Sequence, residues 1–253
     1  YALLWLCLEW LQLDYHWNFL FGGSFCIVIA ILMWLCFPAY PAKTMQRKTL
    51  VLRKRYGLFY LLTFLSGARR QIFMVFAAFL MVEKFGYQAS EVTLLFLINY
   101  SFNWLFAERI GKFIHHFGER NALPAEYIGL IGVFIGYGIV ENSTTAALLY
   151  IIDHMFFAMA IAISTYFQKI AAAEDISASA SVSFTISHIA AVVIPAALGL
   201  VWIQYPSLVF YIGALFAILS LIAVQFIPNN PAPGNEIASR TRSKHFQNEG
   251  RVS

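Results

Sequence analysis

The sequence predicts an all-α fold, a polytopic bundle of transmembrane helices. Three observations predict it: the composition, the recurrence of apolar segments about 20 residues long, and the placement of basic residues between them. Of 253 residues, 60% are hydrophobic and only 12% are charged, whereas a soluble domain averages about 25% charged residues. Too little polar surface remains to cover a soluble globule. The same numbers exclude a soluble enzyme and a disordered chain.

Seven segments are long and apolar enough to cross a bilayer, whose core of about 30 Å needs roughly 20 residues per helix. An eighth segment, residues 1–13, resembles the end of another span, because it is apolar but is interrupted by Glu9 and closed by Asp14. The chain also starts at Tyr1 rather than Met, so we expect a piece of a longer protein. The complete predicted spans are 17–37, 57–82, 92–110, 125–141, 146–168, 181–203 and 207–227.

Basic residues mark the orientation, because translocating Lys and Arg across a membrane is costly. They concentrate in the loop after the first span, in alternate loops beyond it and in the C-terminal tail, while the opposite loops carry only Lys84. The sequence therefore predicts a multi-pass protein of the cell (inner) membrane with a cytoplasmic C-terminus. Residues 228–253 are Pro- and Asn-rich and then charged, which predicts a disordered cytoplasmic tail. Such a basic tail favours contact with the lipid bilayer over nucleic acid.

A long cytoplasmic connection divides the chain. The stretch 38–56 separates the first span from six spans joined by much shorter loops, and long connections usually mark domain boundaries. We expect an N-terminal portion ending at residue 37, a linker over 38–56 and a six-helix domain over 57–227.

The loop after the third span carries a recognisable pattern, with a glycine and a basic residue at Gly111-Lys112 and a second glycine at Gly118, followed by Arg120 and Leu123. This pattern resembles the loop motif of the major facilitator superfamily, although His115 stands where that family usually has an acid. On physical grounds, Gly111 and Gly118 would permit a tight turn between two helix ends. Basic groups there would complement helix C-termini.

Other segments resemble the same family. Residues 17–23 are similar to the start of its sixth helix, the basic stretch 38–55 to the linker between its halves, and residues 167–199 to its tenth-to-eleventh helix connection. The resemblance implies a six-helix C-terminal half of a major facilitator fold with the preceding helix and the linker. It also implies a partner in the missing N-terminal half of the same chain, and alternating-access transport.

Two arginines, Arg69 and Arg70, lie near the middle of the second span, where an ionised group costs at least 2.5 to 3.5 kcal/mol unless it faces a bundle interior or a cavity. Neighbouring helix residues diverge by about 100°, so we expect one arginine to line a cavity beside Gln71 and the other to pair with a neighbour. A purely structural salt bridge to Asp153 is the alternative. Two arginines against one intramembrane acid would leave a positive charge, which favours binding of an anionic solute.

Further polar residues lie within the spans. Asn99 and Asn103 are four residues apart and share a helix face, either as part of a solute site or as ordinary interhelical packing. Asp153 and His154 suit a proton relay, although such a histidine can also be an interfacial residue. His188 is a further candidate for proton coupling. Small residues at Gly132 and Gly136, by contrast, predict close helix packing.

Catalytic motifs are missing: the sequence has no Gly-x-Ser-x-Gly, His-Glu-x-x-His or phosphate-binding loop and no paired-cysteine motif. We therefore expect no enzyme activity, cofactor or metal. The leading hypothesis is a secondary active transporter of a small-molecule solute, an organic anion being the favoured class, coupled to protons. A seven-helix receptor or sensor is the main alternative, and a non-transporting scaffold of the same fold is a weaker one.

Overall fold

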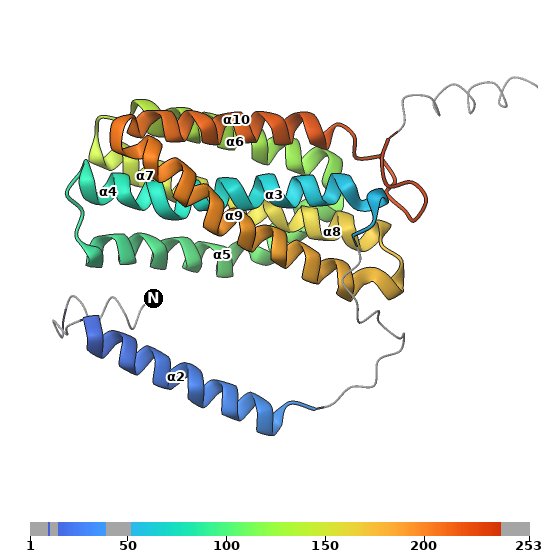
Figure 1. The fold of residues 1–253 in the computed structure, drawn as a ribbon, viewed down its shortest axis with the longest axis horizontal. Helices are drawn as coiled ribbons and strands as arrows, with labels where there is room; N and C mark the ends of the chain where they lie inside the picture. Colours follow the sequence, from blue (N-terminus) through green and yellow to red (C-terminus); the bar gives the residue numbers. More distant parts are fainter. Residues whose placement is uncertain (1–9, 11–14, 39–51, 239–253) are drawn as a thin grey trace, which may run out of the picture.

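A computed structural model describes residue 10 and residues 15–38 and 52–238 of the chain. Within these residues the structure is helical and forms no β-strand, only an isolated bridge between Ala232 and Asn235. The predicted all-α bundle is therefore confirmed (Figure 1). Residues 1–9, 11–14, 39–51 and 239–253 lie outside the description. The predicted eighth span, most of the linker and the end of the tail fall in these ranges.

One helix, α2 (Tyr15–Cys36), stands apart from the rest, and its apolar span is exposed along its length (Figure 1). Six helical runs form the bundle. In chain order they are η1 (Lys54–Tyr56) continuing through α3 (Gly57–Gln71), η2 (Ile72–Ala77) and α4 (Ala78–Glu83); α5 (Ala89–Phe117); α6 (Glu119–Ile139); α7 (Ser143–Phe157) continuing through η3 (Ala158–Ala160) and α8 (Ile161–Ile170); η4 (Ala173–Asp175) with α9 (Ile176–Gln204); and α10 (Pro206–Val224).

Each predicted span corresponds to one of these helical runs. Among the described residues, six helices are long and apolar enough to cross a membrane. Helix α5, which contains the predicted span 92–110, is not among these six. It continues past that span through Lys112 and two histidines to Phe117. The chain is thus a polytopic helical membrane protein.

Local sequence explains where several helices begin and end. A capping box between Gln88 and Glu91 starts α5. The Asn142 side chain accepts hydrogen bonds from two backbone amides at the start of α7, and Pro206 occupies the first position of α10. Gly118, with φ of +75°, separates α5 from α6.

The core consists of two apolar clusters stacked along the bundle axis. The larger apolar cluster includes Ala68, Phe73 and Tyr150, and the smaller apolar cluster includes Leu62 and Tyr127. The most extensive helix pairs are α6 with α10 and α3 with α9. Large apolar side chains are exposed on every bundle helix, as expected of a surface that faces lipid.

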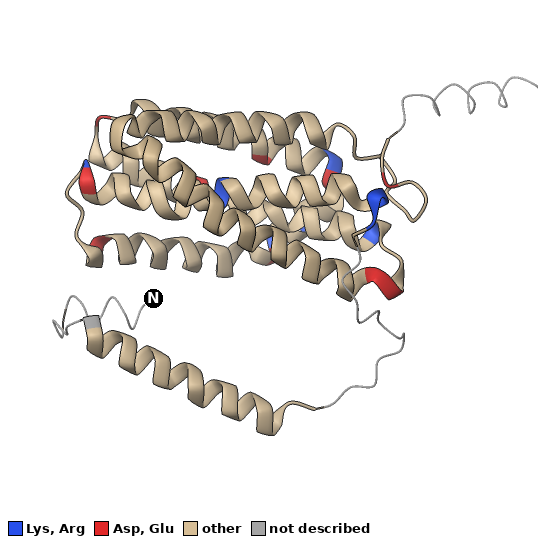
Figure 2. Ribbon diagram, in the orientation of Figure 1, with Lys and Arg blue, Asp and Glu red and all other residues tan. Residues whose placement is uncertain are grey.

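Charged residues gather at the two ends of the bundle, with few between (Figure 2). At one end Lys84 donates to the Val140 carbonyl at 2.6 Å and pairs with Glu141 at 3.2 Å. Glu83 accepts a hydrogen bond from the Trp202 indole at 2.8 Å. These contacts tie α4 to the ends of α6 and α9.

The described part of the tail is folded, which corrects the prediction of disorder over its first residues. Ala238 donates its backbone N–H to the Phe226 carbonyl at 2.8 Å, and the Tyr166 hydroxyl donates to the Glu236 carbonyl at 2.5 Å. Asn235 also bonds back to Asn230. Residues 228–238 therefore lie over the end of α8, where the hydrogen bond from Tyr166 holds them.

Candidate functional site

A polar cluster lies inside the bundle at the level where the two apolar clusters meet. Arg69, midway along the first bundle helix, has a side chain that is 0% exposed. Its Nη2 lies 3.7 Å from Oε1 of Glu126 on α6, and its guanidinium lies 4.5 Å from the centre of the Tyr127 ring. The Nε atom donates to the Leu65 carbonyl one turn earlier at 3.3 Å. Arg69 therefore joins α3 to α6 through an ion pair and a cation–π contact.

Glu126 is the residue that sequence analysis missed. The predicted span began at residue 125, which placed Glu126 at the membrane edge, but α6 begins at Glu119 and carries Glu126 about two turns inside. Its side chain is 0% exposed. The alternative considered from the sequence, a salt bridge from an arginine to Asp153, is accordingly corrected, because Glu126 is the ion-pair partner of Arg69.

Asp153, on α7, is also fully buried. Neither of its carboxylate oxygens has a hydrogen-bond partner among the described residues. Arg69 and the Tyr137 hydroxyl both interact electrostatically with it. The cluster therefore contains one buried arginine and two buried carboxyl groups, rather than the excess of arginine expected from the sequence.

Arg70 points away from this cluster, as the angular separation of neighbouring helix residues requires. Its side chain is exposed, and its guanidinium lies 5.8 Å from the centre of the Phe157 ring. Arg70 also acts electrostatically on half-buried His154, whose ring lies 5.3 Å from that of Tyr100. Arg69 is thus buried inside the bundle, whereas Arg70 is exposed on its surface.

The amides that were predicted to share a face differ in burial. Asn99 is buried and donates from Nδ2 to the Tyr150 carbonyl at 3.5 Å, which ties α5 to α7 beside Asp153. Asn103 and Gln71 are only partly buried. His188 is exposed on α9, and its ring contacts Phe184 of the same helix. The structure therefore buries Asn99 between α5 and α7 and leaves His188 on the surface.

The backbone next to Arg69 is unusual. Directly after Gln71 the helix widens into a π-helical segment, η2, before α4 resumes. π-helical turns are rare and are found frequently at functional sites. No proline or glycine marks this segment in the sequence.

The glycine-rich loop differs from its predicted form. Gly111 lies inside α5, so it forms no turn, and Lys112 makes an exposed ion pair with Glu108 at 2.7 Å. Gly118 alone forms the turn. Arg120 donates to the Asn229 side chain at 2.8 Å and so holds the described tail.

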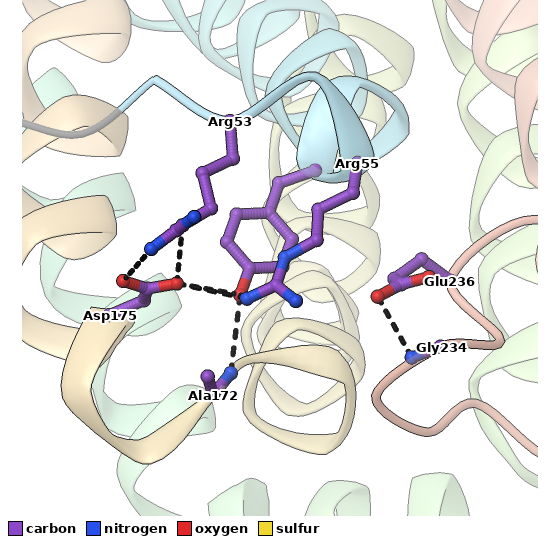
Figure 3. A network of polar contacts seen from close by, with 7 residues as sticks. Arg53, Arg55, Ala172, Asp175, Gly234 and Glu236 are labelled. Carbon is purple, nitrogen blue, oxygen red and sulfur yellow. Dashed lines mark hydrogen bonds and ion pairs between the residues drawn. The ribbon is translucent and has the colours of Figure 1, made fainter.

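The end of the bundle that carries this loop has two further ion-pair groups. Glu119 is nearly buried and pairs with Lys169 of α8 at 2.7 Å. Asp175 accepts hydrogen bonds from Arg53 at 3.0 Å and Arg55 at 2.9 Å (Figure 3). The hydrogen bond with Asp175 raises the pKa of the Arg53 guanidinium. These contacts fasten the start of the first bundle helix to the start of α9.

The site therefore belongs to a polytopic α-helical membrane protein with a sealed, charged interior. No protein-family model matches the chain, and no curated protein matches it significantly.

Proposed function

We propose that the chain is part of a secondary active transporter that moves a small solute across the cell membrane by alternating access. Its bundle would be the C-terminal six-helix half of a major facilitator fold. The observation that carries this proposal is the buried cluster of Arg69, Glu126 and Asp153 at mid-depth in an otherwise apolar bundle. Buried ionisable groups inside a membrane are expensive, and they mark transport and proton pathways by default.

Arg70 is the residue we assign to solute binding. Arg69 is sealed and engaged with Glu126, whereas Arg70 is exposed on a helix that continues directly into a π-helical segment. An exposed guanidinium at mid-span suits a small organic anion, because it can form paired hydrogen bonds with a carboxylate. Asn103 and Gln71, both partly exposed, are the neutral donors we assign to the same surface.

The remaining features agree with this proposal. The end of the bundle that is rich in Lys and Arg, over which the described tail closes, would face the cytoplasm. Helix α2 is exposed along its length and stands apart from the bundle, whereas a seven-helix receptor packs its first helix into one bundle. This separation favours the transporter over the receptor.

Transport by the full-length protein in proteoliposomes tests the proposal. Uptake would be measured with a panel of radiolabelled carboxylates, amino acids and sugars. We expect one class to be transported, Arg70→Gln to abolish its uptake, and Arg70→Lys to retain part of it. Arg109→Gln is the matched control, because it removes an exposed arginine near the end of a predicted span. Unchanged uptake in Arg70→Gln would overturn the assignment of Arg70, and no uptake of any class would overturn the transporter.

A further inference from the structure

The buried cluster has an unbalanced set of formal charges. Arg69 contributes one positive charge, and Glu126 and Asp153 would contribute two negative charges if both were ionised. All three side chains are 0% exposed, so water and salt cannot neutralise the difference. An unpaired charge in such a place is far costlier than a neutral, protonated carboxyl group.

Groups on the surrounding helices do not restore the balance. Helix α10 contains no Asp, Glu, His, Lys or Arg, and the only such residue within α9 is the exposed His188. All the charged and histidine residues of α5 are exposed. The neutral groups that contact the cluster are Tyr127, whose ring lies against the Arg69 guanidinium, and Tyr137, whose hydroxyl interacts with Asp153 and Tyr150. On the other helices around the cluster, Arg70 is exposed and Glu119 pairs with Lys169. A positive charge on half-buried His154 would be opposed by Arg70.

We infer that Glu126 and Asp153 together bind one exchangeable proton, and that Asp153 carries it in this conformation. Glu126 is the acid that pairs with Arg69, at 3.7 Å. The oxygens of both acids lack a hydrogen-bond partner among the described residues, so the ion pair with Arg69 is what distinguishes them. It stabilises the ionised form of Glu126, and the neutral form therefore falls to Asp153.

A metal cation fits the cluster less well than a proton does. Arg69 lies against Glu126 and would repel a second cation, whereas a proton neutralises one carboxyl group without approaching the guanidinium. The described residues also contain no group of three or more His, Cys, Asp or Glu side chains placed to hold a metal ion.

The role of this proton rests on the proposed transport function. When Asp153 releases its proton to water on whichever side is open, its carboxylate competes with Glu126 for Arg69. Arg69 would then be drawn from α6 towards α7. The π-helical segment η2 begins just after Gln71, so the first bundle helix can bend there when Arg69 moves. Protonation of Asp153 and the position of α3 are thereby linked.

Infrared spectroscopy of the full-length protein in lipid membranes near pH 7, without added solute, counts the protonated carboxyl groups. The carbonyl stretch of a protonated buried carboxyl is distinct from that of a carboxylate. We expect one such group in the wild type, none in Asp153→Asn and none in Glu126→Gln, because each single acid left would balance Arg69. We expect two in Arg69→Gln. Glu141→Gln, which changes an acid whose side chain is 84% exposed, is the control and should leave the count at one.

The number of protonated carboxyl groups tests the proton site independently of the transport proposal, because it is measured without solute. A wild-type count of zero, or a count that survives in both single acid variants, would overturn the proton site. If Arg69→Gln does not fold, as judged by size-exclusion chromatography, the two acid variants still decide the matter. Intact transport with a wild-type count of zero would refute only the proton inference. The predicted counts without transport of any solute class would refute only the proposed function.

Discussion

The Glu119–Lys169 ion pair allows a quantitative test, because one partner is nearly buried and the other is half exposed. The lysine Nζ lies 2.7 and 2.9 Å from the two carboxylate oxygens of Glu119. The Glu119 side chain is 5% exposed, while that of Lys169 is 49% exposed. Breaking a fully buried pair by removing one partner costs about 3–5 kcal/mol, and an exposed pair contributes about 0.2–1 kcal/mol.

The two single substitutions should therefore have unequal effects. Lys169→Met leaves a nearly buried carboxylate unpaired, and the N-terminus of α6 offsets roughly 0.5–1 kcal/mol of that cost, so we expect a loss of about 2 kcal/mol in the free energy of unfolding. Glu119→Gln leaves a lysine that can turn to water, so we expect about 1 kcal/mol. For a domain of this size, 1 kcal/mol corresponds to about 2–4 °C in Tm.

Thermal unfolding in detergent, followed by intrinsic tryptophan fluorescence, measures both changes. Lys112→Met is the control, because its pair with Glu108 is at least 75% exposed on both sides, and we expect a change below about 0.5 kcal/mol. If Lys169→Met were no more destabilising than Glu119→Gln, the burial of Glu119 would not be the source of the cost. The reasoning would then be refuted.

Three further changes test the packing and the turns, each by its effect on Tm. Gly118→Ala should lower the free energy of unfolding by about 1–3 kcal/mol, because the residue has a φ of +75°. Gly111→Ala, inside α5, should raise it by roughly 0.5–1 kcal/mol. Equal effects of the two substitutions would contradict the different backbone conformations of these glycines. Gly213→Ala should destabilise by about 1–2 kcal/mol, because its Cβ would lie 2.9 Å from the Phe134 ring, while Gly132→Ala meets nothing within 4 Å and should not destabilise. Asp175→Asn should lower Tm by an amount that shrinks as salt is added, since its arginine partners are partly exposed; a salt-independent loss would point to packing instead.

Hydropathy predicted the existence and order of the helices, because each span must offer about 20 apolar residues to lipid. It did not predict their ends. The α5 extension to Phe117 and the first two turns of α6 include charged and polar residues among the apolar ones, so a hydropathy window ends before the helix does. Gly111 was expected at a turn because glycine permits one, although the helix passes through it.

The predicted position of a helix end also affected which charged residues were expected inside the bundle. The predicted start of the fourth span at 125 set Glu126 at the membrane edge, and the interior then appeared to hold surplus arginine. With α6 starting at Glu119, the same residue is fully buried against Arg69. Shifting one helix start by about two turns thus reversed the sign of the buried charge, and with it the ligand that the interior should attract, from an anion to a proton.

The pairing itself has no local signature. Glu126 is tolerated inside the bundle because a guanidinium from another helix, far away in the sequence, reaches it at 3.7 Å and a Tyr127 ring covers that guanidinium. Neither contact follows from hydrophobic periodicity, since both depend on how α3 and α6 pack. In a membrane, where an unpaired ion is costly, every charged residue within about two turns of a predicted span end should therefore be counted as a possible interior group. The net charge of the interior is the sum over all of these residues, not over the most central ones alone.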